Sequence, residues 1–106
     1  MRTNYNLIEG YYNIVLNLKT RRVTVANYLN NKTDYCLLSK QQTKVLLLLT
    51  DNKIKSNYDI MEFAKYNHIN SAYNAINKIR KKIKEINIKT LNNKGYILIN
   101  KILIDY

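Results

Sequence analysis

The sequence contains no proline, no tryptophan, two glycines, one cysteine and one histidine among its 106 residues. A single cysteine forms no disulfide within the chain, which is typical of a reducing compartment. Cys36 lies between Tyr35 and two leucines, so we expect an inert packed thiol there. The longest apolar run covers residues 45–49, far fewer than the roughly 20 residues of a membrane-spanning helix. The first ten residues are polar and do not resemble a signal peptide.

Acidic residues are also scarce: seven Asp or Glu stand against eighteen Lys or Arg, which gives a net charge of +11. The carboxylates occur singly along the chain, and His68 has no second histidine or suitably spaced cysteine with which to share a metal. The sequence has no Gly-rich phosphate loop and no plausible nucleophile–base pair. We therefore predict a protein that is not an enzyme and needs no metal or cofactor. Its charge indicates a polyanionic partner, nucleic acid before an anionic membrane surface.

The pattern of apolar residues predicts one α+β domain over residues 1–106. Its first part, residues 5–38, is expected to form an antiparallel sheet, because stretches such as residues 23–26 alternate with the period of a half-buried strand. Asparagine supplies turns that glycine and proline would otherwise make, since its side chain tolerates left-handed backbone. The four expected strands cover residues 6–9, 14–17, 22–26 and 34–37.

Residues 39–86 are predicted to form three helices, and residues 87–101 a β-hairpin. The first two helices begin at capping boxes, in which a serine precedes Gln or Asp by three positions. The third helix is expected to begin at Asn70 or Ser71, which are both favourable cap residues. The expected helices cover residues 39–50, 56–66 and 70–86, and the hairpin strands cover residues 88–91 and 96–99 around a turn at residues 92–95.

The third helix is the most informative part of the chain, because one face is apolar and the opposite face carries amides and cations. From residue 71 to residue 101 there are eight Lys or Arg and a single acid, Glu85. Such a helix has the shape and charge to enter a DNA major groove, whereas balancing acids would indicate a solvated surface helix. The apolar face holds Ala72, Ile76, Ile79, Ile83 and Ile86, and the other face and its flanks hold Asn74, Asn77, Lys78, Arg80, Lys81, Lys82 and Lys84.

Four segments resemble, in order, the OmpR/PhoB-type winged-helix DNA-binding domain over about residues 5–100. Residues 38–49 resemble its opening L-T-x-x-E-x-x-L-L-x-L-L, and Ser56 stands where its second helix begins with S-R-x-x-L. Residues 76–83 resemble the recognition helix I-R-R-L-R-K-K-L, and residues 88–96 resemble the wing I-x-T-V-R-G-x-G-Y-R. Because no receiver domain precedes these segments, the chain is most similar to bacterial one-component regulators of the ToxR/CadC type.

The resemblance implies a winged helix-turn-helix with an N-terminal four-stranded antiparallel sheet, three helices and a hairpin wing. It implies a sequence-specific transcription regulator that binds double-stranded DNA, with the third helix in the major groove and the wing on the adjacent minor groove or backbone. It further implies monomers that pair head-to-tail on direct repeats, and a contact between residues 65–69 and RNA polymerase. The residues expected to touch DNA are Asn74, Asn77, Lys78, Arg80, Lys81, Lys82, Asn92 and Lys94.

Individual roles follow from these positions. Asn77 replaces a family arginine, and because asparagine pairs well with adenine we expect A+T-rich sites. Lys78 and Lys81 are expected to face the groove, while Arg80 and Lys82 on the flanks meet phosphates. In the wing, Lys94 is expected to project from the tip. Tyr96 is expected to pack inward near Ile79 or Ile83.

Two further expectations concern location and an alternative function. The chain is expected in the cytoplasm, associated with the nucleoid, or tethered to the inner membrane if a membrane helix follows Tyr106 in the natural protein. Asn92 replaces the arginine of the family wing, which favours an alternative: a winged-helix protein-interaction module that has lost specific DNA binding and uses its tyrosine-rich N-terminal sheet. RNA binding is a third reading, but the exposed aromatic pairs of RNA-stacking sheets are not clearly patterned.

Overall fold

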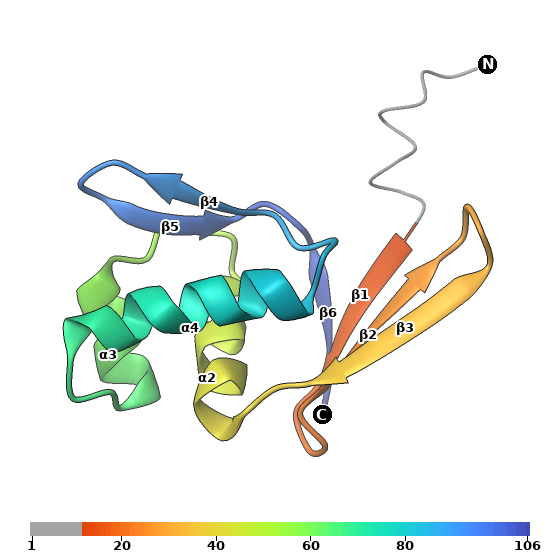
Figure 1. Ribbon diagram of the computed structural model, residues 1–106, viewed down its shortest axis with the longest axis horizontal. Coiled ribbons are helices and arrows are strands. Elements are labelled where there is room, and N and C mark those ends of the chain that lie inside the picture. Colours follow the sequence, from red (N-terminus) through yellow and green to blue (C-terminus); the bar gives the residue numbers. More distant parts are fainter. Residues whose placement is uncertain (1–11) are drawn as a thin grey trace. The chain divides into compact units, whose positions relative to one another are not determined.

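The computed structural model describes residues 12–106, which contain three helices and six strands (Figure 1). These residues fall into two compact units. The first unit contains residues 12–37 and Ile102–Tyr106, and the second contains Leu38–Lys101. Helices and antiparallel hairpins occur side by side in sequence, as the predicted α+β class requires.

The first unit is a sheet whose strands lie in the order β3-β2-β1-β6 within the described residues. Antiparallel pairing joins β1 to β2 and β2 to β3, and alternate residues of β1 and β2 are buried, as the period-two pattern predicted. Three of the four expected strands are therefore confirmed, and the one expected at residues 6–9 lies outside the described residues. The strands are β1 (Tyr12–Asn17), β2 (Arg22–Asn27), β3 (Lys32–Leu37) and β6 (Ile102–Asp105).

The fourth described strand corrects the prediction of a purely antiparallel N-terminal sheet. β6 comes from the C-terminal end of the chain and runs parallel to β1, with Ile14 opposite Ile102 and Leu16 opposite Ile104. The prediction missed this strand because no turn signal or neighbouring segment links two short runs so far apart in sequence. The sheet is therefore mixed.

The second unit begins with two helices that start where the sequence predicted. The Ser39 hydroxyl accepts a hydrogen bond from the backbone N–H of Gln42, whose side chain accepts from the backbone N–H of Ser39 in return. Ser56 and Asp59 form the same reciprocal pair at the next helix. Both capping boxes are confirmed, and they satisfy N–H groups that have no partner within a helix. The helices are α2 (Lys40–Leu49) and α3 (Asn57–Ala64).

The third helix, α4 (Ile69–Lys82), differs from its prediction at both ends. Its N-cap is His68 rather than Asn70 or Ser71, and His68 makes no capping hydrogen bond with its side chain. At the other end Ile83 is already extended, with φ −118°, so the helix stops four residues before the predicted residue 86. No glycine or proline marks the end of the helix in the sequence. The prediction relied on the periodicity of apolar residues alone, and the predicted helix was therefore too long. Ile86 is consequently not part of the apolar face.

The hairpin is confirmed almost residue for residue. β4 (Ile88–Leu91) pairs antiparallel with β5 (Gly95–Leu98), and Lys94 N–H donates to Leu91 O at 3.1 Å across the turn. Asn93 takes the left-handed conformation, with φ +60°, as expected of asparagine in a glycine-poor turn. The hairpin lies within the same compact unit as the three helices.

Candidate nucleic-acid interface

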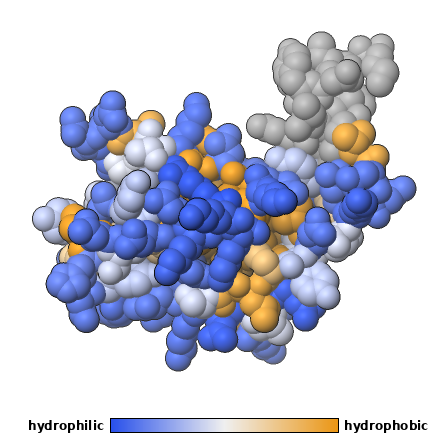
Figure 2. All heavy atoms as spheres, viewed as in Figure 1, coloured by the Kyte–Doolittle hydropathy of each residue, from blue (hydrophilic) through white to orange (hydrophobic). Residues whose placement is uncertain are grey.

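The two faces of α4 are sharply different. Four of its residues, Ala72, Ala75, Ile76 and Ile79, are buried, and they fix the helix within the second unit. The part of the surface over α4 is coloured mainly as hydrophilic in Figure 2. The exposed side chains of this helix are Ile69, Asn70, Tyr73, Asn74, Lys78, Lys81 and Lys82, while Ser71, Asn77 and Arg80 are half-buried.

Two residues of this exposed face were missed by sequence reasoning. Asn70 was assigned to the cap of the helix, but it lies within the first turn and is exposed. Tyr73 is 53% exposed, and the helical period places it on the same side as Arg80. Both residue types bind nucleic acid well, since an amide reads base edges and a tyrosine hydroxyl contacts phosphates. The signal in the sequence that could have identified both residues was a polar stripe of the helix that already begins at residue 70.

Lys78 and Lys81 are the free cations of α4. Neither side chain forms a hydrogen bond or ion pair with another described residue. Lys78 also lines an open cleft of about 290 Å³ between the start of α2 and the middle of α4. None of the lining residues is acidic; they are Ser39, Gln41, Gln42, Tyr66, Ser71, Asn74, Ala75 and Lys78. This side of the unit therefore offers hydrogen-bond donors and positive charge to an anion.

Lys82 is placed differently from the free lysines. Its Nζ donates to Oε1 of Gln42 at 2.8 Å, the same oxygen that accepts from the backbone N–H of Ser39 at 3.0 Å. This hydrogen bond joins the last turn of α4 to the first turn of α2. Gln42 is 8% exposed, so the bond is largely shielded from water. The ammonium group that was expected to meet a phosphate thus already has a protein partner.

Replacing Gln42 by glutamate is expected to stabilise the protein by about 0.5–1 kcal/mol. A carboxylate would keep the capping box, interact favourably with the positive end of the α2 dipole and turn the hydrogen bond from the Lys82 ammonium into an ion pair. The free energy of unfolding from urea denaturation of Gln42→Glu measures this gain. In the Lys82→Ala background the gain should shrink, and an equal gain there would show that Lys82 plays no part.

Arg80 is also engaged by neighbouring groups. Its guanidinium donates from Nη2 to the backbone oxygen of Ile88 and, at 2.9 Å, to Oγ1 of Thr90. Nη1 lies 3.4 Å from Oδ1 of Asn77, and Cζ lies 5.8 Å from the centre of the Tyr96 ring. Arg80 therefore points from α4 toward the hairpin.

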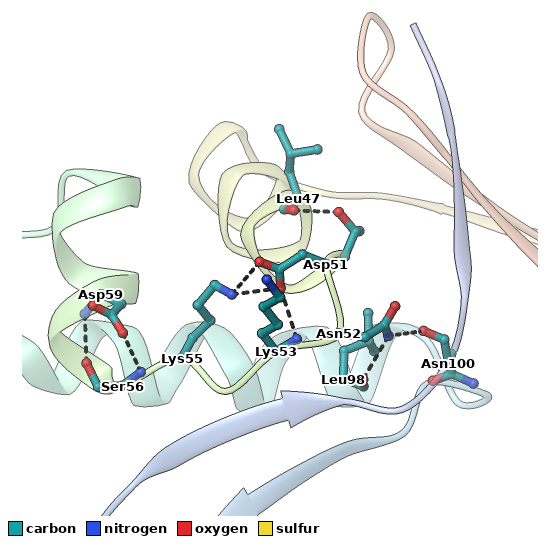
Figure 3. A network of polar contacts seen from close by, with 10 residues as sticks. Leu47, Asp51, Asn52, Lys53, Lys55, Ser56, Asp59, Leu98 and Asn100 are labelled. Carbon is teal, nitrogen blue, oxygen red and sulfur yellow. Dashed lines mark hydrogen bonds and ion pairs between the residues drawn. The ribbon is translucent and has the colours of Figure 1, made fainter.

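The second strand of the hairpin, β5, is held by the segment between α2 and α3 (Figure 3). Lys55 and Tyr96 exchange two backbone hydrogen bonds of 2.8 Å, and the Asn52 amide donates to the backbone oxygens of Leu98 and Asn100 at 2.9 and 2.8 Å. The Lys55 ammonium is paired with Asp51 at 2.7 Å, which lowers the pKa of the Asp51 carboxyl below its ordinary value. These contacts support β5 along its length.

The tip of the hairpin, in contrast, is open. Asn92, Asn93 and Lys94 are exposed, and the Lys94 side chain has no partner among the described residues. Lys94 thus projects from the tip of the hairpin, as predicted. Asn92 and Lys94 lie on this one turn, while Asn74, Asn77, Lys78 and Lys81 lie on α4.

Tyr96 is buried, at 3% exposed, as predicted. Burial raises the pKa of its phenol above the ordinary value, and the nearby Arg80 charge and the Asn57 side chain oppose this rise. Its surroundings include Arg80 of α4 and Asn57 of α3, so the ring lies where the hairpin meets the helices. Its role is that of a packing residue.

Residues 12–106 contain no group of three or more His, Cys, Asp or Glu side chains able to hold a metal ion. In the same part of the chain, no helix combines the length and the apolar character that crossing a membrane requires.

Helices α3 and α4, supported by α2 and followed by the β4–β5 hairpin, make up a winged helix-turn-helix arrangement. No family model and no curated protein matches the chain. Among solved structures, the DNA-binding domain of E. coli CadC is similar, with a TM-score of 0.62 and 14% identity over 78% of this chain and 82% of that one. The DNA-binding domain of Bacillus subtilis CssR is similar with a TM-score of 0.58 and 15% identity, over 72% of this chain and 99% of that one.

These likenesses concern the fold. They confirm the predicted winged-helix fold, which the DNA-binding domains of CadC and CssR share. In that fold α3 and α4 are the two helices of the helix-turn-helix, and β4 and β5 form the hairpin wing.

Proposed function

We propose that this protein is a sequence-specific regulator of transcription that binds double-stranded DNA. The exposed face of α4 is the observation that carries the proposal: it presents amides and partnerless lysines and no acid, on a helix fixed by its buried face. The likeness of the fold to the DNA-binding domains of CadC and CssR supports it. The helix would lie in the major groove, and the wing on the adjacent minor groove or backbone.

Within this proposal the site residues have different tasks. Asn74 and Asn77 would read base edges, for which an Asn side chain suits the N6 and N7 of adenine. Lys78 and Lys81 would enter the same groove. Asn92 and Lys94 would contact the minor groove or its phosphates from the wing tip.

We propose A+T-rich DNA as the partner, since amides occupy two of the proposed groove-facing positions of α4, Asn74 and Asn77, and no arginine occupies the others. The free protein would be a monomer, because a net charge of +11 opposes self-association, and two molecules would pair head-to-tail on direct repeats about one helical turn apart. The short link between α3 and α4 would contact RNA polymerase. The expected location is the cytoplasm, on the nucleoid.

A gel-shift titration against salt, on DNA fragments from upstream of the protein's own gene, tests the proposal. Each phosphate contact adds about −0.9 to the slope of log K against log salt, so several contacts give a steep slope. A cognate fragment should be bound at least about a thousandfold more tightly than unrelated DNA. A shallow slope with equal affinity for all fragments would contradict specific DNA binding and favour the alternative, a protein-interaction module.

Alanine at Lys78 and at Asn77 should have distinguishable effects on DNA binding. Lys78→Ala should weaken cognate binding by about 1–3 kcal/mol if the lysine reads a base edge. Asn77→Ala should reduce the preference for the cognate sequence more than it lowers non-specific binding. Quantitative gel shifts on cognate and scrambled DNA measure both changes. Equal losses on the two DNAs for Asn77→Ala would restrict this residue to the backbone.

A second function is favoured by exposed aromatic and apolar side chains of the sheet unit. Tyr35 is 66% exposed and Leu37 60% exposed on β3, and Tyr28 is 56% exposed in the adjoining turn. Exposed apolar side chains at this density suit a protein contact. The interaction-module function therefore stays as the alternative to specific DNA binding.

A further inference from the structure

Arg80 contacts both strands of the wing with one side chain. Its two hydrogen bonds to the wing go to the backbone oxygen of Ile88 and to the hydroxyl of Thr90, which both belong to β4. Its Cζ lies over the ring of Tyr96 on β5, at 5.8 Å from the ring centre. Lys78 and Lys81 of the same helix form no hydrogen bond or ion pair with the wing.

These contacts occupy the fork of donors that an arginine would offer to a phosphate. The guanidinium is planar and its N–H groups cannot turn independently of one another. With Nη2 bound to β4 and Nη1 directed at Asn77, the group is half-buried and is aimed at the protein. A bidentate phosphate contact would require Arg80 to give up its bonds to the wing.

We infer that Arg80 is a positioning residue, which fixes the wing relative to α4 instead of binding DNA itself. By holding β4, it would set the distance between the major-groove residues Asn77 and Lys78 and the wing-tip residue Lys94. It would also orient the Asn77 amide, whose oxygen faces Nη1. This inference rests on the proposed DNA binding for its effect on affinity, but not for its effect on the wing.

A double-mutant cycle between Arg80 and Lys94 tests the inference on DNA. Lys94→Ala should reduce the magnitude of the salt slope by about one, the value for one lost phosphate contact. Arg80→Ala should also reduce it by about one, because the displaced wing no longer brings Lys94 to the backbone. The double variant should then lose no more than either single variant. A reduction of about two in the double variant would show that Arg80 holds a phosphate of its own and would overturn the inference.

Two matched variants separate geometry from charge. Arg80→Lys keeps the positive charge but loses the fork, so a positioning role predicts that it behaves like Arg80→Ala. A direct phosphate contact predicts instead that lysine restores most of the slope. Lys81→Ala removes a neighbouring free cation, and its loss should add fully to that of Lys94→Ala.

Amide hydrogen exchange without DNA tests the same inference independently. The wing amides, including the Lys94 N–H that donates to Leu91 O, should exchange roughly tenfold faster in Arg80→Lys than in the unchanged protein. Amides in the middle of α2 report whether the rest of the fold is intact and should not change. Unchanged wing exchange would contradict a positioning role. If the unchanged protein bound no DNA while wing exchange rose in the variant, the proposed function would fail and the positioning of the wing would stand.

Discussion

Gly95→Ala is expected to destabilise the protein by at least about 3 kcal/mol and to abolish DNA binding. Gly95 has φ +126°, a conformation that side-chain-bearing residues rarely adopt. A Cβ at this position would lie 2.0 Å from the backbone oxygen of Lys55 and 2.8 Å from the Cα of Ser56. Because both neighbours are backbone atoms, no side chain can turn away to make room.

The bridge between Lys55 and Tyr96 would therefore open, and its two hydrogen bonds of 2.8 Å would be lost with it. Urea denaturation of Gly95→Ala measures the change in stability, and a gel shift measures DNA binding. Asn93→Gly is the matched control. Asn93 is left-handed at φ +60° in the same turn, a conformation that glycine adopts without strain. That variant should stay within about 1 kcal/mol of the unchanged protein. A stable, fully binding Gly95→Ala protein would mean that the wing does not depend on this close approach.

Local sequence signals were sufficient for much of the second unit. Both capping boxes could be read from a serine and its partner three positions later, and the structure has both. The apolar positions of α4 recur at helical spacing, and most of them are buried. The wing could be placed because asparagines and a glycine separate two short apolar runs.

Other features depend on residues that are far apart in sequence. The parallel pairing of β6 with β1 places Ile102 opposite Ile14, and no turn or motif near either residue predicts this pairing. The start of α4 directly after its N-cap His68 was missed for a local reason: α3 ends tightly, with Lys65 left-handed at φ +63° and Tyr66 N–H donating to Met61 O.

The candidate site shows the same limit. Helical spacing predicted that Arg80 and Lys82 lie on the flanks of α4. It could not show that a strand 8 to 10 positions later and a glutamine 40 positions earlier would engage their charged groups. A count of basic residues on the helix therefore overstates the number that are free to meet DNA. Lys78 and Lys81 are free in this sense within the described residues.

Tyr96→Ala is expected to lower the free energy of unfolding by about 3–4 kcal/mol, because it removes a large buried ring where the wing meets the helices. The ring is 3% exposed and has Arg80 above it, so its loss leaves a cavity and also removes a support of the Arg80 guanidinium. Thermal or urea denaturation measures the change. DNA binding should fall because part of the protein is unfolded and because the wing of the folded molecules is displaced. It should not fall further than these two effects explain.

Tyr96→Phe provides the matched control for the ring. It keeps the packing and the contact with Arg80 but removes the hydroxyl group near Asn57, so we expect a loss of only about 1 kcal/mol. Large losses of the same size in both variants would assign the stabilisation to the hydroxyl group instead of the ring. If Tyr96→Ala kept its stability and lost DNA binding at once, Tyr96 would be a direct DNA contact. The wing would then need a different orientation, because a side chain that is almost fully buried cannot reach a phosphate while β5 stays bound to Lys55.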